Sequence, residues 1–320
     1  MNHPKVSVIV PIYGVEKYIG QCARSLMEQT LDDMEFIFVN DATKDESMKV
    51  LDRTLAEYPN RISQVKIIQH EVNLGLPAAR RSGLQAASGS YFIHCDSDDW
   101  MDKEMYAAMY EKAISDNLDM VVCDFYTDPE NGVIWRQYES DKSDYISDLI
   151  MSRSTVSNCN KLVKKSVVDW DCYIWSEDNM GEDIIAAIQY AYYSKQIGYI
   201  HTPFYYYRRR NDSISGTTSV EEVTKKIRQF RNNFDKVLAF LREKKIIDNY
   251  TDEIAHRALS LKNCYLPIIN KMGMYEEWQE TCSDYNKNIL TASSITCKEK
   301  LIYLATYCHL YGLIKGNNCK

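Results

Sequence analysis

The sequence lacks the signatures of several protein classes. None of its ten cysteines lies in a C-x-x-C pair, which argues against a structural zinc site. No apolar run reaches the roughly 18 residues that a membrane-spanning helix needs, and the short run Val6–Val10 before Pro11 is not a secretory signal. The net charge of -7 argues against a basic surface for nucleic acid. We therefore expect a protein of the reducing cytoplasm that does not bind nucleic acid.

Residues 1–125 instead alternate between strand-like and helix-like segments. Thr43 and Glu46 have the spacing of a capping box for the second helix. Such repeated units predict an α/β fold in which helices flank a mostly parallel open sheet. Apolar residues recur at helical spacing between short buried runs that predict strands at Val6–Val10, Phe36–Val39, Val65–Ile68, Tyr91–Cys95 and Met120–Cys123.

Polar residues follow four of the predicted strands. They are Pro11–Tyr13, Asn40–Asp41, Asn73–Gly75 and Asp96–Asp99. Because ligands bind at the carboxyl ends of the strands in sheets of this kind, we expect these segments to converge on one crevice.

The segment YFIHCDSDDW, residues 91–100, ends in three carboxylates, Asp96, Asp98 and Asp99. One interpretation is a turn and a helix cap, which Asp favours. The other is a site for a divalent cation, since Mg²⁺ and Mn²⁺ prefer oxygen ligands and are held by carboxylates together with substrate phosphates. On an extended segment Asp96 and Asp98 point the same way.

Four further residues near strand ends each allow two interpretations. Asp41 either caps its strand or accepts hydrogen bonds from a base or ribose. Tyr13 is either a surface aromatic or a cover for the base. Arg80 and Arg81 either form a solvated helix face or support a bound nucleotide. The residues alone do not decide between the two interpretations in any of these cases.

Two charged clusters lie in the more irregular region from 126 to 218. Glu182 and Asp183 either complement a helix dipole as first-turn acids or include a general base. Arg208, Arg209 and Arg210 either form a solvated patch or neutralise a diphosphate.

Residues 219–320 predict helices, and no Gly-rich or Pro-rich linker precedes them. One face of the first predicted helix carries the apolar residues Val223, Ile227, Phe230 and Phe234. The apolar, aromatic stretch Leu301–Ile314 is flanked by lysines. This stretch either lies at a membrane surface or packs on the domain or on a second subunit.

Six segments, taken in order, resemble the family 2 glycosyltransferases with the GT-A fold. They are VSVIVPIYGVEKYIGQCARSLMEQT, FIFVNDATKD, NLGLPAARRSGL, GSYFIHCDSDDW, GEDI and YYYRRRNDSIS. The resemblance covers about residues 4–218. It implies a GT-A catalytic domain over 1–218, with a nucleotide-binding half to about 125 and an acceptor half over 126–218, followed by a helical region over 219–320.

The resemblance also implies a nucleotide-diphosphate sugar as donor, a divalent metal (Mn²⁺ or Mg²⁺) and transfer with inversion. Asp183 would then be the catalytic base and Asp98 the metal ligand, with Glu182 and Asp99 in support. Arg208 would contact the diphosphate. The residues expected to bind the nucleotide are Pro11, Tyr13, Glu16, Asp41, Arg80 and Asp96.

Two residues depart from the family pattern after the second predicted strand. Ala42 stands where glycine is usual and lacks the freedom of glycine to take positive φ, so we expect this loop to bend differently. Lys44 adds a charge where a small hydroxyl is common. Both departures bear on which base is bound.

We expect an inverting glycosyltransferase that moves a sugar, preferably from a UDP-sugar, to a hydroxyl of a glycan or lipid-linked acceptor in surface polysaccharide synthesis. A sugar nucleotidyltransferase would need a Gly-rich basic loop where Pro11–Glu16 stands, and a dinucleotide dehydrogenase would need the absent G-x-G-x-x-G. The alternative from another class is a non-catalytic nucleotide-sugar or carbohydrate-binding protein of the same fold. The joint presence of Asp96, Asp98 and Asp183 argues against it.

Overall fold

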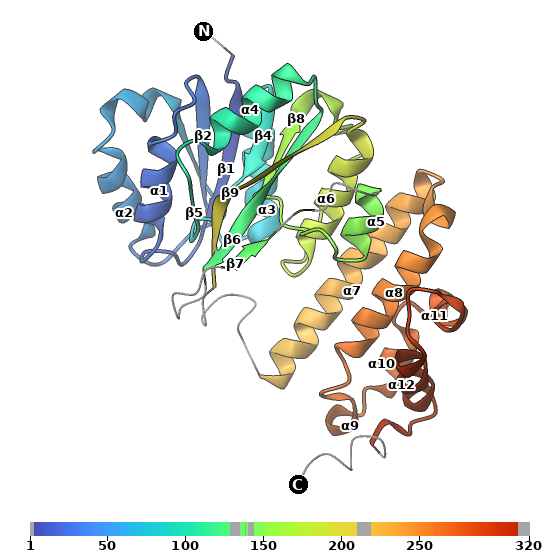
Figure 1. The fold of residues 1–320 in the computed structure, drawn as a ribbon. Helices are drawn as coiled ribbons and strands as arrows, with labels where there is room; N and C mark the ends of the chain where they lie inside the picture. The colour runs from blue at the N-terminus through green and yellow to red at the C-terminus, as the bar shows by residue number, and fades with distance from the viewer. Residues whose placement is uncertain (1–2, 129–134, 138, 140–143, 210–218, 313–320) are drawn as a thin grey trace.

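The computed structural model describes residues 3–128, 135–137, 139, 144–209 and 219–312. A twisted sheet with helices on both faces occupies one end of the molecule, and the helices α7 to α12 extend from it at the other end (Figure 1). The long helix α7 (Val220–Glu243) runs between the two parts.

The described residues form a sheet of nine strands in the order β3-β2-β1-β4-β8-β6-β9-β5, with β7 beside β6. Strands β1 to β4 pair in parallel, as do β6 and β9, whereas β5, β7 and β8 join antiparallel. The predicted α/β class is confirmed, with parallel pairing concentrated in the N-terminal half. The strands are β1 (Val6–Ile12), β2 (Met34–Asn40), β3 (Val65–Gln69), β4 (Tyr91–His94), β5 (Trp100–Met101), β6 (Met120–Asp128), β7 (Trp135–Gln137), β8 (Lys161–Lys164) and β9 (Ile197–Arg208).

Two hydrophobic layers enclose the sheet. Successive residues of a strand point to opposite faces, so Val8 and Val10 of β1 pack in one layer and Ile9 in the other. The first layer holds α1 (Ile19–Met27), α2 (Ser47–Leu55) and α4 (Met105–Ser115). The second holds α3 (Leu76–Ala86), α5 (Tyr145–Ile150) and α6 (Glu182–Tyr193). Because both faces of β1 are covered, all seven of its residues are buried.

The capping box predicted from Thr43 and Glu46 is wrong. Helix α2 begins at Ser47, and the side chain of its N-cap residue Glu46 makes no capping hydrogen bond. Asp45 takes that role, because its Oδ1 accepts hydrogen bonds from the backbone N–H of Ser47 at 3.1 Å and from the Ser47 hydroxyl at 2.6 Å. Thr43 instead donates to Asp45 at 2.7 Å.

The C-terminal helices share their hydrophobic core with α5 and α6, and α7 packs directly on α6. The division at residue 218 therefore stays an interpretation of the sequence. After α7 come α8 (Thr251–Asn263), α9 (Ile269–Met272), α10 (Tyr275–Glu280), α11 (Asn286–Thr291) and α12 (Cys297–Tyr307). None of the helices described here has the length and apolar character to span a bilayer.

We expect Gly83→Ala to destabilise the fold, because α3 packs on β1 with no room for a methyl group at this position. A Cβ there would lie 2.4 Å from Cγ2 of the buried Ile9. Overpacking of this kind costs roughly 1–3 kcal/mol, although alanine is ordinarily the better helix former. Urea unfolding measures the change. Gly20→Ala in α1 is the control, since its new methyl meets its nearest neighbour at 3.3 Å, and an equal or smaller loss for Gly83→Ala would contradict the packing argument.

Candidate active site

The loops that follow β1 and β2 are tied together at the carboxyl edge of the sheet. Gly14 donates its backbone N–H to the Thr43 hydroxyl at 2.9 Å. The Glu16 carboxylate accepts the backbone N–H of Glu46 at 3.0 Å, while Pro11 is buried in β1. Tyr13 lies beside these contacts and is 50% exposed. A ring that is fixed at its backbone and open to solvent is suited to cover a base. This role of Tyr13 stays a prediction, and so do contacts of Pro11 and Glu16 with the nucleotide.

Asp41 organises a neighbouring loop from a buried position. Its carboxylate accepts the backbone N–H groups of Leu74 and Gly75 at 2.9 and 2.8 Å, and it pairs with His70 Nδ1 at 2.7 Å. The residue is only 3% exposed. These contacts support a role in shaping the 73–76 loop, and direct contact between Asp41 and a base stays a prediction.

The expectation that Ala42 bends this loop away from the glycine conformation is wrong. Ala42 adopts φ of 53°, in the left-handed region that glycine favours. Its neighbour Asn40 stabilises the turn by accepting the backbone N–H of Thr43 at 2.9 Å. The loop therefore keeps the positive φ at the cost of a side chain in a disfavoured region.

The three acids after β4 have different surroundings. Asp99 is 1% exposed, accepting the Tyr205 hydroxyl at 2.6 Å and the Arg208 backbone N–H at 2.7 Å. Burial, together with the charges of Asp98 and Asp96, raises the pKa of Asp99 well above its ordinary value. Asp99 thus joins β9 to the acidic loop through these two hydrogen bonds. It does not cap α4, whose N-cap is Glu104.

Arg208 lies against the same acidic loop. Its guanidinium packs over the rings of Trp100 and Tyr18, at 4.6 and 5.2 Å from their centroids. It also donates to the Asp98 backbone carbonyl at 2.9 Å and to Gln21 at 2.7 Å. The structure therefore holds Arg208 beside the predicted metal ligand. Arg209 is exposed, and Arg210 lies outside the described residues.

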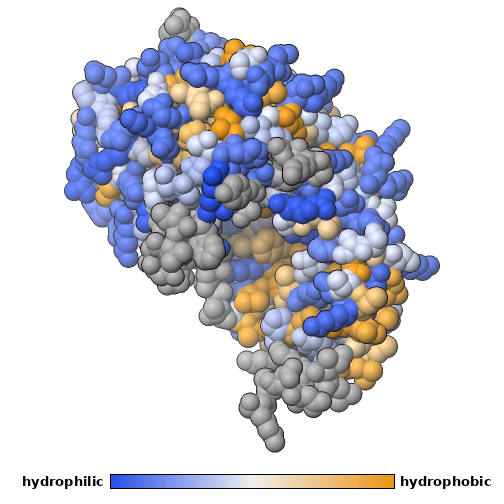
Figure 2. Space-filling model, viewed as in Figure 1, coloured by the Kyte–Doolittle hydropathy of each residue, from blue (hydrophilic) through white to orange (hydrophobic). Residues whose placement is uncertain are grey.

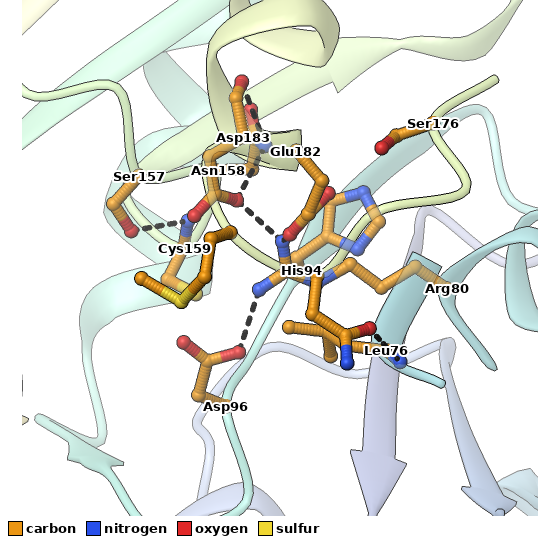
Figure 3. Close-up of polar contacts among 12 residues, drawn as sticks. Leu76, Arg80, His94, Asp96, Ser157, Asn158, Cys159, Ser176, Glu182 and Asp183 are labelled. Atoms are coloured by element: carbon orange, nitrogen blue, oxygen red, sulfur yellow. Dashed lines mark hydrogen bonds and ion pairs between the residues drawn. The ribbon is translucent and has the colours of Figure 1, made fainter. Parts of the chain in front are cut away.

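Arg80 does not lie on a solvated helix face, and its support of a bound nucleotide stays a prediction. It is 4% exposed, and its guanidinium joins three carboxylates from two distant parts of the chain. One amino group bonds Asp96 at 2.7 Å, and the other contacts both Glu182 and Asp183. Figure 3 shows the three acids arranged around this single cation. Arg80 therefore links the acidic loop after β4 to the first turn of α6.

The pKa values of the two acids of α6 are shifted in opposite directions. Burial favours the neutral form of Asp183, but the Arg80 charge and hydrogen bonds outweigh it and hold the pKa of Asp183 below its ordinary value. Burial raises the pKa of Glu182 well above its ordinary value against the attraction of Arg80, and the Asp183 charge adds to the effect. The opposite directions of the two pKa shifts place the more acidic group at Asp183, which is therefore the ionised carboxylate of the pair. An ionised and 30% exposed carboxylate can accept a further proton.

Several residues that sequence reasoning missed support this pair. Asn158 donates its side-chain amide to Asp183 Oδ1 at 2.9 Å. His94 lies in the same cluster (Figure 3). Burial and the Arg80 charge lower the pKa of His94 to about 3, so its imidazole is neutral. Arg80 is thus the cation that balances the acids drawn in this view.

The loop before α6 is held from two sides. Asn179 accepts the backbone N–H of Leu76 at 3.0 Å, which joins this loop to the one shaped by Asp41. From α7, Asn233 donates to the carbonyls of Asp178 and Met180 at 3.1 and 2.9 Å. The C-terminal helices therefore help to place Glu182 and Asp183, a dependence that no local sequence signal shows.

The donor set at the acidic loop fits a metal that is shared with a substrate. The described residues contain no group of three His, Cys, Asp or Glu side chains that could hold an ion alone. Asp98 is partly exposed, and one oxygen of Asp96 is already paired with Arg80. Mg²⁺ is commonly bound by one or two carboxylates together with substrate phosphates, so Asp98 suits this kind of site.

Comparison with known proteins agrees with this geometry. A glycosyltransferase of Bacillus subtilis, EpsH, is 27% identical over 296 residues, covering 88% of this chain and 80% of its own. A poly(ribitol-phosphate) beta-glucosyltransferase of Bacillus spizizenii is 35% identical over 109 residues, which are 33% of this chain and 17% of its own. The S. aureus TarS structure 1–349 with UDP-GlcNAc superposes with a TM-score of 0.69 at 18% identity, covering 98% of this chain and 92% of that one.

The resemblance seen in the six motifs is confirmed at the level of the family. Residues 7–169 match the family described as Glycosyl transferase family 2. The TarS superposition supports the same GT-A fold over nearly the whole chain. The protein is therefore a glycosyltransferase and belongs to glycosyl transferase family 2.

Proposed function

We propose that this protein transfers a sugar with inversion from a UDP-sugar to a hydroxyl of a glycan or lipid-linked acceptor, in the synthesis of a surface polysaccharide. The observation that carries the proposal is the ionised, partly exposed Asp183 joined through Arg80 to the acidic loop of Asp96 and Asp98. The UDP-GlcNAc bound by TarS supports a UDP-sugar as donor. The poly(ribitol-phosphate) glucosyltransferase supports a surface polymer as acceptor. We place the enzyme in the cytoplasm, where it meets lipid-linked acceptors at the membrane surface.

The chain's own residues divide the work of a single displacement. The acceptor hydroxyl attacks the anomeric carbon, the carbon–oxygen bond to the diphosphate breaks, and the hydroxyl proton passes to Asp183. Arg80 and Asn158 hold that carboxylate in place. Asp98 would hold a divalent metal, Mn²⁺ or Mg²⁺, which when bound stabilises the charge of the leaving diphosphate. Arg208 lies next to Asp98 and adds positive charge there.

Asp183→Asn should retain binding of the nucleotide sugar and lose transfer by roughly 10² to 10⁴-fold, because the amide cannot accept the proton. Calorimetry with the donor and a transfer assay separate the two effects. Glu182→Gln is the matched control, since burial favours the neutral form of this acid and the amide keeps its shape, so its loss should be much smaller. Near-normal turnover of Asp183→Asn, or an equal loss for Glu182→Gln, would remove Asp183 as the base.

Asp98→Ala should abolish the gain in UDP affinity that Mn²⁺ gives, because the metal then has no carboxylate from this position. Titration of the wild type with Mn²⁺ alone should show weak binding, since the diphosphate must complete the ligand set. Asp102→Ala removes a nearby acid outside the loop of Asp96 to Asp99 and should keep the metal-dependent gain. Equal metal dependence in Asp98→Ala and wild type would exclude Asp98 as the ligand.

Arg80→Lys should move the acid limb of the pH profile of kcat to higher pH, by about one pH unit or more. The compact ammonium of lysine lacks the two separate amino groups with which Arg80 contacts Asp96 on one side and Glu182 and Asp183 on the other. The pKa of Asp183 therefore rises toward its ordinary value, and the base is protonated sooner as the pH falls. Arg81→Lys, the exposed neighbour that stacks on Trp175, should leave the limb in place. An unshifted limb in Arg80→Lys would mean that Arg80 does not set the protonation of the base.

A further inference from the structure

Helix α12 turns an apolar face to solvent. Leu301, Leu304 and Tyr307 are 66%, 42% and 47% exposed, whereas Tyr303 and Thr306 on the opposite side are buried against the C-terminal helices. Surface helices ordinarily show the reverse arrangement. Figure 2 shows hydrophobic residues gathered over this end of the molecule, in contrast to the hydrophilic surface of the sheet domain. Exposed apolar patches of this kind mark interaction sites.

The spacing of the exposed residues fits a second helix. Cys297, Leu301, Leu304 and Cys308 follow one another at steps of four, three and four residues, and all four are exposed. This is the a/d spacing of a heptad, whose narrow seam packs against one other helix. The buried Tyr303 lies outside the seam, so α12 can pack on its own domain and on a partner at once.

The seam is complementary to itself when reversed. In an antiparallel pair, Leu301 faces the partner's Leu304, and Cys297 faces the partner's Cys308. Lys298 then lies beside the partner's Tyr307, where an ammonium group can pack on the ring. A two-fold interface requires this kind of self-complementarity. We propose that α12 is a dimerisation helix that pairs antiparallel with α12 of a second copy of this chain.

Charge favours a protein partner over a lipid surface. Lys300, one of the two lysines in α12, donates its ammonium to the Ala292 carbonyl at 2.7 Å. The chain carries a net charge of -7, which opposes binding to anionic lipid. In the antiparallel pair, by contrast, Lys298 approaches the C-terminal end of the partner helix, where a positive charge is favourable.

The interface is small, so the dimer should be reversible. A helix of eleven residues is about 16 Å long, and one face of it buries less than the roughly 1,200 Å² of a standard interface. We therefore expect the monomer–dimer equilibrium to fall within reach of protein concentrations from about 1 to about 300 µM.

Sedimentation equilibrium over that range tests the proposal. The average mass of the wild-type chain should rise from one toward two chains, and the double variant Leu301→Glu/Leu304→Glu should stay at one. Ile114→Glu is the matched control, because Ile114 is 55% exposed on α4, away from the seam, and it should dimerise as the wild type does. Urea midpoints verify that all three fold.

Three results would overturn the proposal. The first is a wild type that stays monomeric throughout the concentration range. The second is a double variant that dimerises normally. The third is a monomeric wild type that co-sediments with anionic vesicles when the double variant does not. The last result would assign the face to a membrane.

The native cysteines report the direction of the pair. Mild oxidation of the wild type, followed by peptide mapping, should give a Cys297–Cys308 link between two chains. A Cys297–Cys297 or Cys308–Cys308 link in its place would contradict the antiparallel arrangement. Both cysteines lie outside the proposed active site, so this readout is independent of whether the proposed transfer reaction is correct.

Discussion

One buried cation holds the active site together. The Arg80 guanidinium joins Asp96, which follows β4, to Glu182 and Asp183, which begin α6. Breaking such a buried group of charges by removing one partner costs several kcal/mol, because the remaining charges are left without compensation. The same ion pairs that join these two segments also lower the pKa of Asp183, so the local structure and the charge of the proposed base both depend on one side chain.

The fold places that cation by packing on both faces of the sheet. Helix α3 approaches β1 closely enough that Gly83 has no space for a side chain, and this brings Arg80 under the acidic loop. Asn233 of α7 holds the loop before α6 by donating hydrogen bonds to two of its carbonyls. The C-terminal helix α7 therefore contributes to the position of the site.

The sequence alone was sufficient for the strand–helix alternation and for the carboxyl-edge location of the acids, because both follow from local apolar periodicity. It did not predict the burial of Arg80, although a signal was present. Arg80 stands three residues after Pro77 and four before Leu84, on the buried face of the helix, whereas Arg81 stands off that face.

Other site residues had no such signal. Asn158 and Asn179 reach the site from loops whose course is set by tertiary contacts, and single asparagines in a loop are typical of turns. The capping box failed for a related reason. The side chain of Asp45 competed successfully for the N–H at the start of α2, and Thr43 was bound to a loop from another strand.

The central claim is that Arg80 lowers the pKa of Asp183, the proposed base, while burial raises the pKa of the adjacent Glu182. A ¹³C NMR titration of the side-chain carboxyls measures this directly in the free enzyme. The account predicts that Asp183 titrates below the ordinary aspartate pKa and that Glu182 titrates well above the ordinary glutamate pKa. A Glu182 that titrates at or below the ordinary glutamate pKa, or an Asp183 that titrates above the ordinary aspartate pKa, would contradict it.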